Sequence, residues 1–279
     1  MKLLSRLKGF GEIKSFDNRW EIILNRLFFP RTGIVTYRRG NIEVIVDHLG
    51  GDAAGTRMCL VSDMYSQYFR DMVLSEELSV LDIGANGGGF PLRLHLEGYT
   101  VGQLTCVEMN PNTFARLQLN LYRNLALTPC LINGAIFSEK TLLKVLLGRG
   151  STGDSIAAQE KTGQGPNVLE REIQAQTFDD IFQTGFGDCL VDICKMDVEG
   201  AEYDVFSHPG HENLKKCRYL LMEIHERQGF TKDQVINAIE ALEFKNITKS
   251  PSKHPEVYCF ENTPLKENMP VDREAGNAG

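Results

Sequence analysis

Several signals are missing from this 279-residue chain, and each absence excludes a class of protein. No apolar run approaches the roughly 20 residues that a membrane-spanning helix needs. The seven cysteines are odd in number and form no Cys-x-x-Cys pair, which favours reduced thiols in a cytosolic protein. The formal net charge of −7 argues against a nucleic-acid partner, because that partner requires a clustered basic surface. We therefore expect a cytoplasmic protein that acts on a small or lipid-linked molecule.

Motifs for phosphate binding and acyl transfer are missing as well, since the chain has no P-loop, no nucleophile elbow and no Gly-x-Gly-x-x-Gly fingerprint. Residues 80–90 instead form a short apolar strand followed by an acidic residue and a glycine-dense turn. The spacing is Asp82-x-Gly84-x-Asn86-x-Gly88. This is a nucleotide-binding strand-to-helix turn without the glycine spacing that seats a pyrophosphate. S-adenosyl-L-methionine, which carries no phosphate, fits such a turn better than a dinucleotide.

From Ser79 onward, strand-like and helix-like segments alternate, which is typical of a parallel sheet covered on both faces. The sequence predicts a doubly wound, mostly parallel, seven-stranded α/β sheet. The predicted strands are 79–83, 104–108, 130–136, 190–197, 218–225, 244–249 and 256–261. The predicted helices are 88–97, 111–124, 177–184, 201–207 and 231–242. Three helix starts have capping signals, at Asn110-Pro111, at Thr177 with Asp180, and at Thr231 with Gln234.

An N-terminal extension, residues 1–60, precedes the main domain in this prediction. Residues 17–29 have the spacing of a packing helix, and the β-branched runs 34–37 and 42–46 suit a hairpin. The helix residues expected on one packing face are Trp20, Ile23, Leu24, Leu27 and Phe28. A further helix is expected over 65–73.

The main domain is predicted to span residues 61–265 and to contain an insertion at 142–174. Two runs, 142–147 and 168–174, suit a hairpin whose Gly/Ser/Gln-rich tip is either a functional lid or a plain loop. The polar residues 266–279 predict a flexible tail.

Acidic residues end several predicted strands. Asp82 ends the first, Glu108 the second and Asp197 the fourth, so all three are expected at the carboxyl edge of the sheet beside its topological switch point. Glu108 is placed to accept hydrogen bonds from ribose hydroxyls. Asn133, at the end of the third strand, is either an adenine contact or an ordinary turn residue before Gly134. Together with Gly84, Asn86 and Gly88, the residues Asp82, Glu108, Asn133 and Asp197 form the predicted cofactor site.

Glu223 and His225 lie on one face at the end of the fifth strand. A histidine at this edge is suited to remove a proton from a substrate hydroxyl, and Asp197 is the alternative base. Glu199 follows at the start of a helix, where the helix dipole stabilises a negative charge. A metal site built from Asp197, Glu199, Glu223 and His225 is conceivable, but no ligand spacing demands one. The predicted catalytic residues are therefore His225, Asp197 and Glu223, with no metal.

These segments, taken in order, resemble the FkbM-type S-adenosylmethionine-dependent methyltransferases. The resemblance rests on residues 81–88, 107–111, 195–202 and 223–225, and covers about residues 60 to 261. Its most distinctive part is Lys195-x-Asp197-x-Glu199-Gly-Ala-Glu. The resemblance implies a Rossmann-like class I methyltransferase fold with an antiparallel last strand. It also implies methyl transfer to a hydroxyl of a sugar, glycan, polyketide or other secondary metabolite.

Three alternatives remain open. A protein of the same fold could bind the cofactor without catalysing transfer, although the acids and the histidine weigh against this. Nitrogen methylation is a second alternative, but the Asn/Asp-Pro-Pro-aromatic segment common in such enzymes is missing at the fourth strand. The third alternative, an NAD-dependent dehydrogenase, lacks its fingerprint.

Overall fold

The computed structural model describes residues 10–29, 33–50, 52–148 and 169–267. The tip of the predicted insertion and nearly all of the predicted tail lie outside the described residues. Within these ranges, no helix combines the length and the apolar character needed to cross a bilayer.

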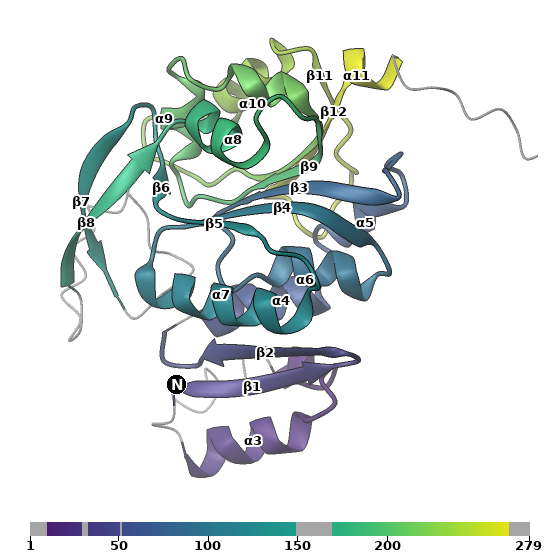
Figure 1. Ribbon diagram of the computed structural model, residues 1–279, viewed down its shortest axis with the longest axis vertical. Helices are drawn as coiled ribbons and strands as arrows, with labels where there is room; N and C mark the ends of the chain where they lie inside the picture. Colours follow the sequence, from purple (N-terminus) through teal and green to yellow (C-terminus); the bar gives the residue numbers. More distant parts are fainter. Residues whose placement is uncertain (1–9, 30–32, 51, 149–168, 268–279) are drawn as a thin grey trace, which may run out of the picture.

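Seven strands form the main sheet in the order β11-β12-β10-β9-β3-β4-β5 (Figure 1). Their bounds are β3 Glu77–Ile83, β4 Thr100–Glu108, β5 Cys130–Asn133, β9 Val191–Met196, β10 Cys217–Glu223, β11 Phe244–Asn246 and β12 Val257–Asn262. β12 is antiparallel to both of its neighbours, whereas β5, β4, β3, β9 and β10 pair in parallel. The predicted doubly wound, mostly parallel sheet is confirmed. Its central strand β9 is buried along its whole length, as expected for a strand covered on both faces.

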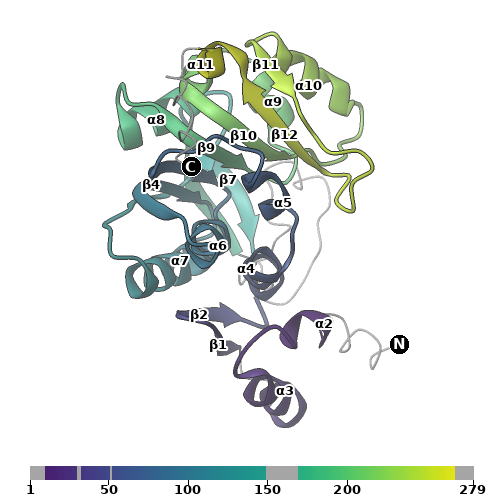
Figure 2. The same ribbon diagram turned by 90° about the vertical axis from the view of Figure 1, so that its right-hand side faces the viewer.

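Helices cover both faces of this sheet (Figures 1 and 2). One face carries α4 (Asp52–Val61), α6 (Gly89–Leu96) and α7 (Pro111–Asn124), and the other carries α8 (Phe178–Phe186), α9 (Glu202–Phe206) and α10 (Lys232–Glu240). Short helices complete the described chain: α5 (Ser66–Phe69), the 3-10 helix η2 (Glu212–Lys216) and α11 (Thr263–Glu267). The predicted caps are confirmed, because Asn110 caps α7 and capping boxes begin α8 at Thr177 and α10 at Thr231.

Helix α4 has no counterpart among the predicted elements, and it packs directly on the glycine turn. A Cβ on Gly89 would come within 2.9 Å of the Thr56 carbonyl oxygen, and a Cβ on Gly87 would overlap the Thr56 hydroxyl. That hydroxyl donates to Asn86 Oδ1 (3.0 Å) and accepts from the Gly87 amide (3.2 Å). Two of the turn's glycines therefore allow α4 to approach the backbone closely. α4 also crosses the predicted domain boundary at residue 60.

The N-terminal extension consists of α2 (Phe10–Ile13), α3 (Arg19–Phe28) and the antiparallel hairpin β1 (Ile34–Arg39) and β2 (Ile42–Asp47). Two asparagines of α7 join this hairpin to the main domain. The Glu43 and Ile45 amides donate to Asn124 (2.9 Å) and Asn120 (2.7 Å), whose side chains donate back to the same two residues. Two side-chain amides thus satisfy the backbone of β2 as a neighbouring strand would.

The predicted packing face of α3 is wrong for four of its five residues, and of the five only Ile23 packs against the core. Trp20, Leu24, Leu27 and Phe28 are 67%, 51%, 61% and 70% exposed, and the buried residue of the helix is Ile22. A periodic apolar stripe identifies a helix face but does not determine which face meets the rest of the chain. The outermost layer of the molecule is therefore this helix (Figure 2).

The insertion forms its own small sheet. β7 (Thr141–Leu147) pairs antiparallel with β8 (Leu169–Gln176), as predicted, and β6 (Ala135–Ile136) adds a parallel strand. The predicted strand 130–136 is thus split at Gly134, where a Cβ would come within 2.8 Å of the Gln174 carbonyl oxygen. The predicted helix over 65–73 is likewise reduced to α5.

Candidate active site

A cavity of about 260 Å³ opens at the carboxyl edge of β3, β4 and β9. Its walls include the glycine turn, Glu108, Gly134, Asp197 and Glu223. This is the topological switch point, where doubly wound sheets bind their ligands. The volume is close to the lower end for small-molecule sites, about 300 Å³.

Gly84 fixes the shape of the first wall. Its φ is +77°, and any Cβ would collide with the Asp197 carbonyl oxygen, because the ends of β3 and β9 meet there. Its own carbonyl accepts a hydrogen bond of 2.8 Å from Lys195 Nζ. Only glycine allows the backbones after β3 and β9 to approach each other this closely.

Asp82 is not among the residues that line the cavity, and its predicted contact with the cofactor stays a prediction. Its side chain is fully buried, and Oδ1 lies 3.2 Å from Lys195 Nζ. Burial raises the pKa of Asp82, and the neighbouring ammonium opposes that rise. Burial lowers the pKa of Lys195, but the charges of Asp82 and Asp197 outweigh it and raise that pKa. The geometry makes Asp82 the ion-pair partner of Lys195 in the core.

Glu108 does line the cavity and is held from two sides. Its Oε2 accepts from the Asn86 amide (3.0 Å) and its Oε1 from the Asn110 amide (2.8 Å). Asn86 adopts a positive φ of 50°, which its side-chain bond from Thr56 supports. These two amide bonds fix the orientation of the Glu108 carboxylate on the cavity wall.

Gly88 and Asn133 are not part of the cavity lining. A Cβ on Gly88, whose φ is +85°, would come within 3.1 Å of Leu117 and Leu121, so this glycine serves the packing of α6 against α7. The exposed Asn133 amide donates to the carbonyls of Glu108 (2.8 Å) and Met109 (3.2 Å). This position therefore fits the alternative of an ordinary turn residue.

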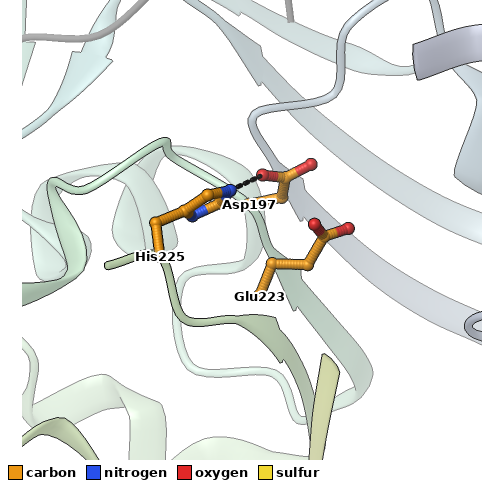
Figure 3. A group of neighbouring side chains, drawn as sticks. All are labelled: Asp197, Glu223 and His225. Atoms are coloured by element: carbon orange, nitrogen blue, oxygen red, sulfur yellow. Dashed lines mark ion pairs between the residues drawn. The ribbon is translucent and has the colours of Figure 1, made fainter. Parts of the chain in front are cut away.

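The three predicted catalytic residues lie close together (Figure 3). Asp197 follows β9, while Glu223 and His225 lie at and beyond the end of β10, and one donor atom from each falls within 4.8 Å of the others. His225 Nε2 lies 3.7 Å from Asp197 Oδ1 and 3.5 Å from Glu199 Oε2. His225 is not among the residues that line the cavity, whereas Asp197, Glu199 and Glu223 are.

Negative charge is concentrated around His225. Its Nδ1 lies 2.8 Å from Oε1 of Glu202, whose side chain is fully buried in α9. Burial lowers the pKa of His225, but the hydrogen bond and charge of Glu202 and the charges of Glu199 and Asp197 outweigh it, and the pKa rises to about 9. Burial, reinforced by the charge of Asp197, raises the pKa values of Glu199 and Glu223 to about 7 each.

Other cavity residues were not identified from the sequence. Thr56, Met58 and Cys59 come from α4, and Met64 and Tyr65 come from the segment before α5. The Tyr65 hydroxyl donates to Glu223 Oε1 and fixes that carboxylate. These residues carry no motif, and only the contact between α4 and the glycine turn brings them to the site.

The sheet order and the position of the cavity are those of the Rossmann-like methyltransferases. A family profile described as "Methyltransferase FkbM domain" matches residues 82–249. The chain belongs to the FkbM methyltransferase family, as its motifs indicated.

Solved structures similar to this chain include a methyltransferase FkbM from Methylobacillus flagellatus KT, with 14% identity, a TM-score of 0.47 and coverage of 75% of this chain and 54% of that chain. This chain thus spans about half of the Methylobacillus protein. TrmK of M. capricolum, in complex with S-adenosyl-homocysteine, aligns at 9% identity over 73% and 70% of the two chains, with a TM-score of 0.42. TYW2 of P. horikoshii, in complex with MeSAdo, aligns at 12% identity over 82% and 69%, with a TM-score of 0.41. No curated protein matches this chain.

Proposed function

We propose that this protein transfers the methyl group of S-adenosyl-L-methionine to a hydroxyl group on a glycan, a sugar or a secondary metabolite. One observation carries the proposal: Glu108, fixed by two backbone amides, lines the same cavity as the carboxylates of Asp197 and Glu223. The Glu108 carboxylate is suited to accept hydrogen bonds from a ribose, and the carboxylates of Asp197 and Glu223 are suited to contact an acceptor hydroxyl. Family membership supports the methyl donor, and the acid cluster supports oxygen as the acceptor atom.

The cofactor site in this proposal consists of Gly84, Asn86 and Glu108, with Asp197 beside the reacting end. Two ribose hydroxyls donate to the Glu108 carboxylate, which its amide partners hold in place. The sulfonium is a cation, so the nearby carboxylates of Asp197 and Glu223 favour its binding electrostatically. Asp82, Gly88 and Asn133 support this site through packing and backbone contacts.

Catalysis is largely a matter of positioning. The acceptor oxygen attacks the methyl carbon, a carbon–oxygen bond forms, and the carbon–sulfur bond breaks to release neutral S-adenosylhomocysteine. The hydroxyl proton passes to a carboxylate on the cavity wall, where Asp197, Glu199 and Glu223 lie. His225 is a positioning residue in this scheme, because its two ring nitrogens face Glu202 and Asp197.

We propose the predicted domain division with one change at its boundary. We assign residues 61–265 to the methyltransferase domain and residues 1–60 to the extension, except that α4, which spans Asp52–Val61, belongs with the cavity it lines.

Calorimetry tests the cofactor directly. The protein should bind S-adenosylmethionine and S-adenosylhomocysteine but not NAD, and Glu108→Gln should weaken both interactions. A screen with labelled S-adenosylmethionine over sugars, glycans and polyketides then identifies the acceptor. NMR of the labelled methyl group distinguishes a methyl ether from an N-methyl product.

His225→Ala provides the test of the reacting end. We expect turnover to be abolished while cofactor affinity stays near that of the unmodified protein. Unchanged turnover would remove His225 from the site. Cofactor binding without transfer to any acceptor would favour a binding protein of the same fold, and label on nitrogen would refute oxygen methylation.

A further inference from the structure

The side chains of Asp197, Glu223 and His225 together form a donor set for a metal ion (Figure 3). They come from two neighbouring strand ends, and one oxygen or nitrogen from each lies within 4.8 Å of the other two. Three donors around a common point occupy one side of a coordination sphere and leave the other side open. The spacing in the sequence does not reveal this set, because β9 and β10 are adjacent only in the folded sheet.

Glu202 provides an independent observation that points to a ligand. Its fully buried carboxylate lies 2.8 Å from His225 Nδ1 and orients the ring so that Nε2 lies 3.7 Å from Asp197 Oδ1. Metal-binding histidines are commonly held in this way, with the second nitrogen donating to a carboxylate. The hydrogen bond from Nδ1 to Glu202 fixes the tautomer in which Nε2 binds a cation once that cation displaces the Nε2 proton.

Asp197 supplies a further observation. Its Oδ1 is almost completely covered by protein, yet within the described part of the chain it accepts no hydrogen bond. Tyr65 meanwhile donates to Glu223 and restrains that carboxylate. The surroundings are rich in acid, with Glu199 Oε2 3.5 Å from His225 Nε2, while Lys195 Nζ lies 3.8 Å from the other oxygen of Asp197, Oδ2. A covered, unsatisfied carboxylate oxygen in this field costs free energy unless a cation meets it.

We propose that Asp197, Glu223 and His225 bind one divalent cation of the Mg²⁺ and Mn²⁺ class. Two hard carboxylate oxygens favour this class over zinc or copper, and Mn²⁺ also accepts an imidazole. The carboxylates of Asp197 and Glu223 line the cavity, so the open coordination positions face an incoming acceptor. The cation orients the acceptor hydroxyl and lowers its pKa. This use of the cation rests on the proposed function, whereas its binding does not.

Titration with Mn²⁺ tests the site in the full-length protein without a methyl donor. Electron paramagnetic resonance measures the loss of the free Mn²⁺ signal, and we expect one bound equivalent. Electron spin echo modulation should show coupling to one imidazole nitrogen, and His225→Gln should abolish that coupling. Asp197→Asn and Glu223→Gln should weaken binding by at least about 10-fold, and Glu202→Gln by about 10- to 100-fold.

Asp63→Asn is the matched control. Asp63 also lies beside a histidine, 3.3 Å from His254 Nε2, but it is half-exposed and is not among the residues that line the cavity. This variant should bind Mn²⁺ like the unmodified protein. Thermal unfolding shows which variants fold. If Asp197→Asn fails to fold, His225→Gln still tests the site, because the His225 side chain is partly exposed and its replacement disturbs the core less.

The outcomes separate the two proposals. No Mn²⁺ binding, or binding that folded His225→Gln and Glu223→Gln leave unchanged, would overturn the metal site even if S-adenosylmethionine binds. Mn²⁺ binding with the nitrogen coupling, but without methyl transfer, would support the site and contradict the proposed function.

Discussion

The buried ion pair of Lys195 and Asp82 should dominate the stability of the sheet edge. Lys195 and Asp82 are 4% and 0% exposed, and Nζ lies 3.2 Å from Oδ1. Replacing Lys195 with Met leaves the Asp82 carboxylate unpaired in the core. Loss of one partner of a buried pair costs about 3–5 kcal/mol, a large share of the about 5–15 kcal/mol that holds a typical domain folded.

Replacing both partners should cost much less than the sum of the single changes. In Lys195→Met combined with Asp82→Leu no buried charge of the pair remains, so the desolvation penalty disappears together with the attraction. Two further losses persist, because Lys195 Nζ also donates to the Gly84 carbonyl at 2.8 Å and lies 3.8 Å from Asp197 Oδ2. That hydrogen bond is worth about 1 kcal/mol. We therefore expect a coupling free energy of at least about 2 kcal/mol.

Equilibrium unfolding in urea, followed by circular dichroism at pH 7, measures the four proteins of this cycle. The surface pair of Lys216 and Asp188, 2.9 Å apart with the Asp188 side chain 98% exposed, is the matched control with the same residue types. Its coupling should be indistinguishable from zero, since solvent screens exposed ion pairs. If Lys195→Met alone costs less than about 1 kcal/mol, or if the buried pair shows no coupling, the reasoning from burial is refuted.

Three further predictions concern the cavity, the extension and a helix cap. Glu108→Gln should weaken S-adenosylmethionine binding in calorimetry by about 10- to 100-fold, because hydrogen bonds to a charged group contribute about 1.5–3 kcal/mol; unchanged affinity would exclude Glu108 from the site. Burial, reinforced by the charges of Arg26 and Arg57, lowers the pKa of His48 to about 4, below its ordinary value near 6.5. As the pH falls, His48 therefore takes up its proton in the unfolded chain before it does so in the folded protein. The contribution of His48 to the unfolding free energy should fall between pH 6.5 and 4, by about 1 kcal/mol at pH 5 after allowance for partial exposure. Other groups titrate equally in both proteins, so the unfolding free energy of the unmodified protein minus that of His48→Gln, measured in urea, should fall by about 1 kcal/mol from pH 7 to pH 5, and an unchanged difference would contradict this prediction. Thr177→Ala should lower the unfolding free energy by about 1 kcal/mol through loss of the α8 capping box, and a change to Ser should restore it.

Much of the fold was predictable because its signals are local. Residues 90–96 alternate in apolar character, but the glycine turn before them and the crossover after it require a helix, and α6 forms there. The caps at Asn110 and Thr177 act within one helical turn. Continuous apolar runs likewise mark strands covered on both faces, as in β9.

Other features could not be predicted because they depend on contacts between distant segments. The expected packing face of α3 is exposed, since periodicity does not name a partner. Helix α4 carries no strong periodic signal, yet it forms one wall of the cavity by packing on Gly87 and Gly89. Asp82 was expected to face a ligand, but Lys195, which lies beside it on the neighbouring strand, pairs with it instead.

The sequence by itself determined the family, the doubly wound sheet and the edge at which its acids gather, because strand period, glycine spacing and caps are properties of neighbouring residues. The tertiary structure decided which of those acids face the cavity and which pair inside the core. It also brought Asp197, Glu223 and His225 within reach of one ion. The physical reason is that burial and through-space distance set the role of a charged group, and both depend on segments that meet only when the sheet closes.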